Sequence, residues 1–321
     1  MNATRYAFCV ASLRALEGRL LTKEDITTLT GCKELTAALN FLVQKGYACE
    51  NEDINDIAAR HTKELNRTLF ESVPDKKELD TLYILNDYFN LKVLVKSLIE
   101  KNDAAELFAY PTTIDPSVLN SASAENVFSS LKVSYAEAAG QAYSIALKSR
   151  NGKFSDAVID TAAVNALTAY AATKNSGILG RICAFTADTA NMKTALRCAF
   201  TGQDEDFIKE AIGDCTELDK VKLISSASSG TDELISYLEG SAYAKGLEIY
   251  LSSPSAFEKW CDDNIIAIAS ESVYTSFGFD PAVSYFYRKS LEIKTVRMIL
   301  TAIKSGIDKN IIKERLRELY A

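Results

Sequence analysis

The sequence predicts an all-α protein. Apolar residues recur three and four positions apart through most of the 321 residues, which is the period of an amphipathic helix. Alternating apolar and polar runs long enough for a strand are absent, and the sequence has only five prolines. From the mean length of helices in globular proteins, we expect roughly fifteen to twenty of them.

Three segments carry the helical pattern most clearly. The first, 83–99, spaces its apolar residues by three or four, and the third, 284–303, does likewise. The second, 162–172, is rich in alanine, which forms helices well and allows close packing. The sequence therefore predicts a helix over each of them.

Clusters of turn residues predict the breaks between helices. The segment from Pro111 to Pro116 separates a first lobe from a second, and Ser225 to Thr231 predicts a loop. Asp280 and Pro281 suit a helix start, with the aspartate as N-cap and the proline at the first helical position. Further turns are expected at 151–152, 252–254 and 278–281.

A polar motif repeats three times along the chain. Residues 87–92 (DYFNLK) reappear as 188–193 (DTANMK), and 291–294 (LEIK) form a degenerate third copy. The lysines are 101 residues apart (193 − 92 and 294 − 193), and a basic residue closes each copy. An acidic or polar start follows each copy and predicts a short amphipathic helix there, at 102–107, 204–212 and 308–316.

Self-similarity at a fixed period indicates one structural unit built several times. We therefore predict three helical lobes, 1–117, 118–218 and 219–321. The third copy has Glu292 where the other two have asparagine, which indicates that the copies are not equivalent.

The repeated motif has two interpretations. On a helix, Asp87 and Asn90 share one face, and Lys92 and Lys96 share another. The polar face either contacts a partner, or its Asp and Asn satisfy backbone groups where lobes meet while the Lys and Arg are solvated or paired locally. The sequence leaves both open.

Composition excludes several classes of protein. The net charge of −7 argues against a nucleic-acid or anionic-lipid surface. No run of 18 apolar residues predicts a membrane span, and the charged, amphipathic stretch 1–21 reads as a first structural helix rather than a signal peptide. The seven scattered cysteines are expected to be reduced core thiols of a cytosolic protein.

No catalytic motif is visible. His61 is the only histidine and lies in a polar stretch, where we expect it to be exposed. Zinc sites and histidine-based triads need more imidazole groups or properly spaced thiolates. The glycines at 177 and 180 lack the Lys-Ser/Thr end of a P-loop. We expect no metal, cofactor or nucleotide. An all-α enzyme that uses carboxylates alone remains an alternative.

At three places the residues resemble a known family. They are Arg5-Tyr6-Ala7 through Arg14 with Gly18 to Leu21, Asn90-Leu91-Lys92, and Tyr287 to Arg297 with the 311–319 helix. This ordered set resembles the C subunit of prokaryotic V/A-type ATPases, the counterpart of the d subunit of eukaryotic V-ATPases, over the whole chain.

The resemblance implies three helical lobes related by pseudo-threefold symmetry, forming a funnel with a central opening. A protein of this kind lies peripherally on the cytoplasmic face of the membrane and holds the central shaft on the membrane rotor ring. It rotates with them, couples ATP hydrolysis or synthesis to ion transport, and is not an enzyme. Its partners are the proteins of the shaft and the ring, with no nucleic acid or nucleotide. A helical-repeat scaffold that binds soluble partners is the alternative.

The candidates for lining the opening or binding partners are Tyr6, Arg14, Asn90, Lys92, Lys96, Asn191, Lys193, Arg197, Arg288, Glu292, Lys294 and Arg297.

Overall fold

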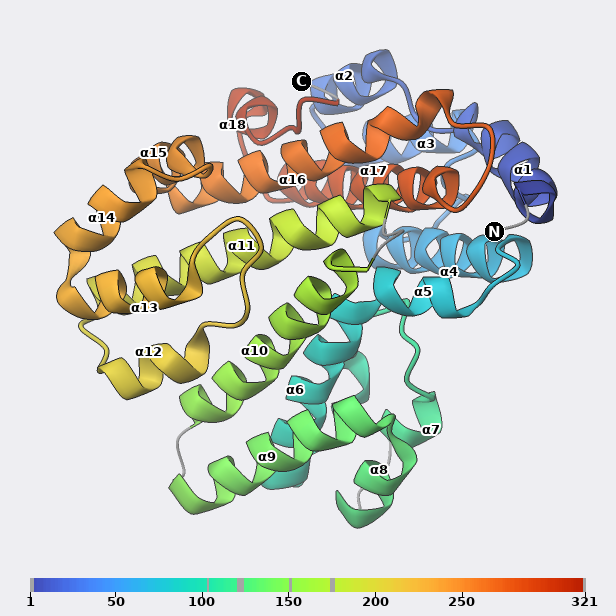
Figure 1. Ribbon diagram of the computed structural model, residues 1–321. Coiled ribbons are helices and arrows are strands. Elements are labelled where there is room, and N and C mark those ends of the chain that lie inside the picture. The colour runs from blue at the N-terminus through green and yellow to red at the C-terminus, as the bar shows by residue number, and fades with distance from the viewer. Residues whose placement is uncertain (1–2, 103, 120–123, 150–151, 174–176, 320–321) are drawn as a thin grey trace. The chain divides into compact units, whose positions relative to one another are not determined.

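The computed structural model describes the chain except for residues 1–2, 103, 120–123, 150–151, 174–176 and 320–321 (Figure 1). The described residues form eighteen α-helices and three 3₁₀ helices, with no strand among them. The prediction of an all-α protein is therefore confirmed.

The chain divides into two compact units. Unit 1 combines residues 1–76 with residues 249–321, and unit 2 is the continuous segment 77–248. Helix α15 (Ala244–Ser252) contains the boundary between them. The three lobes of the sequence analysis describe the internal repeat, and they stay a prediction.

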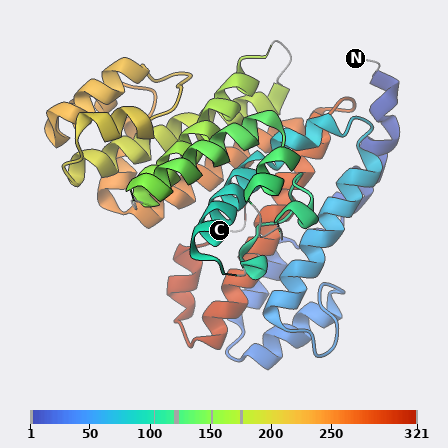
Figure 2. The same ribbon diagram turned by 90° about the horizontal axis from the view of Figure 1, so that it is seen from below.

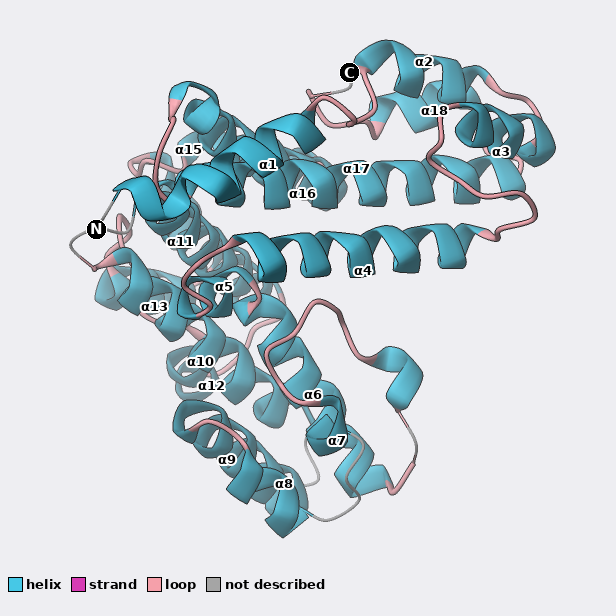
Figure 3. Ribbon diagram, turned by 90° about the vertical axis from the view of Figure 1, so that its right-hand side faces the viewer, coloured by secondary structure: helices cyan, strands magenta, loops and turns pink. Residues whose placement is uncertain are grey.

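Unit 1 is built around its longest helix, α17 (Asp280–Lys304). This helix packs against α4 on one side and against α1 and α16 on another (Figure 3). The blue N-terminal helices and the red C-terminal ones thus lie side by side (Figure 2). The other elements are η1 (Ala3–Tyr6), α1 (Ala7–Glu17), α2 (Lys23–Gly31), α3 (Leu35–Gln44), α4 (Ile54–Ser72), α16 (Pro254–Ser270), η3 (Glu271–Tyr274) and α18 (Lys309–Glu314).

The core of unit 1 joins residues from opposite ends of the chain. Ile299 and Leu300 of α17 are fully buried together with Ile26 and Leu42 of the N-terminal helices. Burying such a side chain contributes roughly 1.5–3 kcal/mol, so the contact between the two chain segments is a main source of the unit's stability.

Unit 2 is built around α10 (Gly152–Ala171), which packs against α6, α9, α11 and α12 (Figure 1). Small residues make the approach of α9 close, since Ala139 and Ala142 are fully buried against Leu91 and Ile159. The other helices are α5 (Lys77–Leu82), α6 (Ile84–Glu100), η2 (Ala105–Leu107), α7 (Pro116–Leu119), α8 (Ala124–Ser130), α9 (Val133–Ser149), α11 (Gly177–Phe200), α12 (Glu205–Ala211), α13 (Lys220–Ser229) and α14 (Thr231–Glu239).

The predicted helices over 83–99, 162–172 and 284–303 correspond to α6, the second half of α10, and α17. The predicted loop from Ser225 to Thr231 is wrong, because α13 continues to Ser229 and the break falls at Gly230. Leu223 and Ala227 are buried on one face of α13, and the hydroxyls of Ser228 and Ser229 bond to carbonyls one turn back. A serine-rich run is therefore compatible with a helix when its apolar face is packed.

Helix starts follow the predicted capping chemistry with one shift. Asp204 and Asp308 cap α12 and α18 by accepting hydrogen bonds from backbone amides of the first turn. Helix α17 begins one residue earlier than expected, so Phe279 is its N-cap and Asp280 lies in its first turn. An acid in the first turn is still favoured there by the helix dipole. The predicted short helix after the first motif is only the single turn η2.

Candidate functional site

The two aspartates of the repeated motif make matching contacts. Asp188 on α11 accepts hydrogen bonds from the Thr216 amide (2.8 Å) and hydroxyl (2.7 Å), the Glu217 amide (2.7 Å) and the Tyr243 hydroxyl (3.1 Å). Its counterpart on α6, Asp87, is equally buried. It accepts from the hydroxyls of Thr112 and Thr113, the Thr113 amide (2.8 Å) and the Tyr135 hydroxyl (2.8 Å).

The two asparagines of the motif also match. Asn90 donates to the carbonyl of Ala109 (3.0 Å) and accepts from its amide (2.7 Å). Asn191 likewise accepts from the amide of Gly213 (2.9 Å) and donates to the carbonyls of Gly213 (3.2 Å) and Asp214 (3.0 Å). In the first two copies the Asp and Asn therefore fix the loop that follows the helix, as the second interpretation of the motif predicts. Buried backbone groups in such a loop need partners of this kind.

The third copy replaces this arrangement with a buried ion pair. At the same spacing of 101 residues, Asp188 corresponds to Lys289 (289 − 188) and Asn191 to Glu292 (292 − 191). The side chains of Lys289 and Glu292 form an ion pair, and Glu292 also accepts from the amide of Leu21 at 2.6 Å. Burial raises the pKa of Glu292, while the charge of Lys289 acts in the opposite direction.

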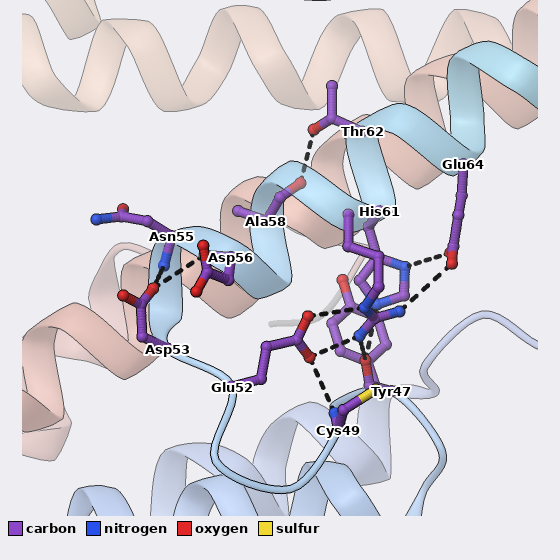
Figure 4. Close-up of polar contacts among 11 residues, drawn as sticks. Tyr47, Cys49, Glu52, Asp53, Asn55, Asp56, Ala58, His61, Thr62 and Glu64 are labelled. Atoms are coloured by element: carbon purple, nitrogen blue, oxygen red, sulfur yellow. Dashed lines mark hydrogen bonds and ion pairs between the residues drawn. The ribbon is translucent and has the colours of Figure 1, made fainter. Parts of the chain in front are cut away.

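Lys289 faces an aromatic cluster between α3 and α4. Its ammonium nitrogen lies 4.8 Å from the centroid of the Tyr47 ring, a cation–π distance. The ring of His61 lies against the same tyrosine, with ring centroids 3.9 Å apart, and its Nε2 is 2.9 Å from the Tyr47 carbonyl oxygen. This cluster and the loop beside it are drawn in Figure 4.

Arg60 holds the loop that contains Tyr47. Its guanidinium donates two hydrogen bonds to the carboxylate of Glu52, at 2.8 and 2.9 Å, and one to the Tyr47 carbonyl at 2.7 Å. The same carboxylate accepts from the amide of Cys49 at 2.9 Å (Figure 4). A two-pronged Arg–carboxylate contact of this kind fixes geometry as well as charge.

The prediction that His61 is exposed is wrong, because only 6% of its surface is accessible. A signal for this was present in the spacing, since Ile57, His61, Leu65 and Leu69 lie four apart and share the buried face of α4. Burial, then the charge of Lys289, lowers the pKa of His61 to about 4. The imidazole is therefore neutral near pH 7, and it serves as a packing and hydrogen-bonding group.

Three candidates at the start of the chain and on α17 also have internal roles. Arg14 donates to the carbonyls of Ser272 (2.7 Å), Val273 (3.1 Å) and Thr275 (3.1 Å), and pairs with Glu17 at 2.7 Å. Arg288 lies 3.9 Å from the same glutamate. The side chain of Tyr6 is fully buried.

The basic candidates fall into two groups. Lys92 and Lys96 on α6 pair with Asp160 (2.7 Å) and Asp156 (2.8 Å) of α10. Lys193 is half-buried, whereas Arg197, Lys294 and Arg297 are the exposed candidates on α11 and α17. Lys92 and Arg197 line one cleft of unit 2, and Lys294 and Arg297 line a groove of unit 1.

The cysteines show no reactive arrangement in the part of the chain that the structure describes. Cys9, Cys183 and Cys198 are buried, and Cys49 is exposed, so the expectation of core thiols holds only for some of them. Burial raises the pKa of Cys183 to about 12, which keeps it a protonated, unreactive thiol.

Comparison with known proteins places the chain in a family. The ATP synthase (C/AC39) subunit family matches residues 9–315. The chain belongs to this family. A curated relative, the C subunit of the A-type ATP synthase of Desulfurococcus sp. (strain SY), is 23% identical over 339 residues, which cover 98% of this chain and 92% of the relative. The resemblance to the C subunit of V/A-type ATPases is thereby confirmed.

Membership in the C/AC39 family makes the protein one of the subunits of an ATP synthase, with the other subunits of that complex as partners. Among the described helices, none combines the length and the apolar character needed to cross a bilayer.

Proposed function

We propose that this C/AC39 family member is a non-catalytic part of the central stalk of a V/A-type ATPase. It connects the rotating shaft to the membrane rotor ring, on the cytoplasmic face, and so couples ATP hydrolysis or synthesis to ion transport. The observation that carries the proposal is the family match over residues 9–315, which includes all three copies of the repeated motif.

The internal contacts support a mechanical role. Buried carboxylates and amides on α6 and α11 fix the loops that follow these helices, and an ion pair occupies the same positions on α17. These polar groups have partners inside the chain. Such contacts stiffen a close-packed helical body, and a close-packed interior transmits strain. A coupling element needs stiffness of this kind and no chemistry of its own.

The predicted funnel and its lining belong to this proposal. Tyr6, Asn90, Asn191 and Glu292 are buried, so the exposed charged candidates for contacts to shaft or ring are Lys96, which is paired with Asp156, and Arg197, Lys294 and Arg297. A low-resolution image of the isolated protein tests the funnel, since a solid bundle without an axial opening contradicts it.

Deletion of the gene tests the coupling role. In inverted membrane vesicles from the deletion strain, we expect ATP-driven ion pumping to be lost and to return when the protein is supplied. If pumping persists at the wild-type rate without the protein, the coupling role is wrong. Fractionation separates the scaffold alternative, because a rotor component stays with washed membranes and a scaffold for soluble partners stays in the supernatant.

A further inference from the structure

Two long motif helices are each followed by a short capped helix, and a groove lies between the two members of each pair. The first lies between α11 and α12, and the second between α17 and α18. Counted from the capping aspartates, Asp204 and Asp308, the residue three positions on is Phe207 in one and Ile311 in the other. These two residues therefore hold the same position along their short helices.

In unit 2 the helix α10 of the chain itself covers Phe207, and a cleft of about 640 Å³ remains beside it between α10, α11 and α12. The ring of Phe154 on α10 meets the Phe207 ring edge-on with centroids 4.9 Å apart, and the Lys153 ammonium lies 4.1 Å from the centroid of the Phe207 ring. The hydroxyl of Thr161 donates to the carbonyl of Glu210 at 2.7 Å. Phe207 is consequently only 6% exposed.

In unit 1 the apolar side chains of the corresponding groove are exposed. Ile311 is 46% exposed and Ile307 is 40% exposed, although the next residue, Ile312, is buried in the core. The two isoleucines border a groove of about 350 Å³ whose other side includes Met298. Exposed apolar residues gathered in a groove mark a binding surface more often than scattered ones do.

Three exposed basic side chains also line this groove. Lys294 and Arg297 come from α17, and Arg315 follows α18. Within the described part of the chain, no carboxylate lies within 4 Å of their charged groups. The protein as a whole has a net charge of −7, so this groove is a local site of opposite sign. Its charge favours an acidic occupant.

In the first copy of the motif, acidic side chains of a helix of the chain itself pair with the lysines. Lys92 corresponds to Lys294 at twice the repeat spacing (294 − 92 = 202). It is paired with Asp160 of α10, and Asp156, four residues earlier on the same helix face, pairs with Lys96. One helix, α10, thus supplies the apolar cover of Phe207 in the second copy and two carboxylates a turn apart to the lysines of the first copy.

From this internal precedent we propose that the groove between α17 and α18 is a docking site for an acidic amphipathic helix of a partner protein. The apolar side of that helix covers Ile307 and Ile311, and carboxylates one turn apart pair with Lys294, Arg297 and Arg315. The inference rests on the proposed function only in expecting the helix to come from another protein of the ATPase.

Photo-crosslinking in the intact ATPase tests the site. The variant Ile311→p-benzoylphenylalanine is assembled into the complex in membranes, irradiated, and the attached segment is read by mass spectrometry. We expect a segment of another protein with helical apolar spacing and acids four residues apart. Attachment to lipid, to a second copy of this chain or to a segment without such acids overturns the proposal, as does the absence of any attachment.

Charge reversal tests the ion pairs. In the same crosslinking background, the triple change Lys294→Glu, Arg297→Glu and Arg315→Glu is expected to lower the crosslink yield about tenfold, because three attractions become repulsions. Lys33→Glu, at an exposed site of unit 1 outside the groove, is the matched control and is expected to leave the yield unchanged.

An unchanged yield in the triple variant contradicts the site, provided that its thermal unfolding matches that of the control. Ion pumping separates the two proposals. A failed crosslink with pumping still dependent on the protein rejects the docking site alone, whereas pumping that persists in the deletion strain rejects the rotor role.

Discussion

The ammonium of Lys289 faces the ring of Tyr47 at 4.8 Å, and the corresponding aspartates of the first two copies face tyrosines too. Asp87 and Asp188 accept hydrogen bonds from the hydroxyls of Tyr135 and Tyr243. All three copies therefore place a tyrosine against the same position of the motif helix. In the third copy the charge at that position is inverted, so the tyrosine presents its ring face instead of its hydroxyl.

The buried ion pair of the third copy is predicted to be tolerated in the folded protein only while both charged partners are present. Lys289→Met leaves the Glu292 carboxylate buried without its cation, which is expected to cost about 3–5 kcal/mol of unfolding free energy. Lys289→Met combined with Glu292→Gln is expected to recover most of this loss, because glutamine keeps an acceptor for the Leu21 amide. Urea unfolding of the wild type and both variants measures this recovery of unfolding free energy. If the double variant is less stable than Lys289→Met, this account of the pair is wrong.

The buried aspartates are predicted to be equally important in the first two copies. Asp87→Ala and Asp188→Ala each leave several buried donors without an acceptor, and each is expected to cost about 3 kcal/mol. Asp206→Ala, at an exposed position on α12, is the control and is expected to stay within about 0.5 kcal/mol of the wild type. Chemical denaturation of the three variants gives the comparison. A large difference between the two buried sites contradicts their structural equivalence.

The contribution of His61 to stability is predicted to fall as the pH drops from 7 to 5. With a pKa of about 4 in the folded protein and about 6.5 unfolded, His61 takes up a proton mainly in the unfolded state within this range. The unfolded state is favoured accordingly, by about 2 kcal/mol at pH 5 relative to pH 7. The raised pKa of Glu292 acts in the opposite direction, because its protonated form is the one that the folded state prefers.

His61→Gln isolates the histidine in this measurement. The wild type and the variant both keep Glu292, Lys289, Arg60 and Glu64 around the site. The difference between their profiles of unfolding free energy against pH therefore reports His61. We expect the profile of the variant to be flatter between pH 5 and 7. Because His61 is the only histidine, its ring resonances can also be followed by NMR without ambiguity, and a midpoint near 6.5 in the folded protein contradicts the burial described above.

Arg14 is predicted to hold the turn after α16 in place. Arg14→Ala removes its contacts to three carbonyls of residues 272–275 and is expected to speed amide exchange or proteolysis in that turn. Arg14→Lys keeps the charge but not the planar fork, and is expected to rescue only part of the protection. Protection equal to that of the wild type in the alanine variant contradicts the role.

The helices were predictable because their apolar periodicity is long and regular, as in α6 and α17. The capped starts of α12 and α18 were predictable because an aspartate before an apolar run has one dominant local use. The serine-rich end of α13 was not, since burial of Leu223 and Ala227 outweighs the local preference of serine for turns.

Parts of the candidate site depend on contacts that no spacing reveals. The three tyrosines that meet the motif helices are 88 and 108 residues apart (135 − 47 and 243 − 135), so the 101-residue period does not identify them. The burial of His61 was obscured by its polar neighbours on α4, although its four-residue spacing from Ile57 and Leu65 indicated the buried face. The correspondence of Lys289 to Asp188 was hidden because the two side chains differ in charge.

Unit 1 is built from the two ends of the chain, and this affects how the protein folds during synthesis. Unit 2 is continuous and can form as soon as residues 77–248 have left the ribosome, but α1 to α4 pack on α17, which is made near the end of translation. The first 76 residues must therefore wait for the last quarter of the chain with apolar faces uncovered. That interval is when the nascent protein is most exposed to aggregation and most in need of a chaperone.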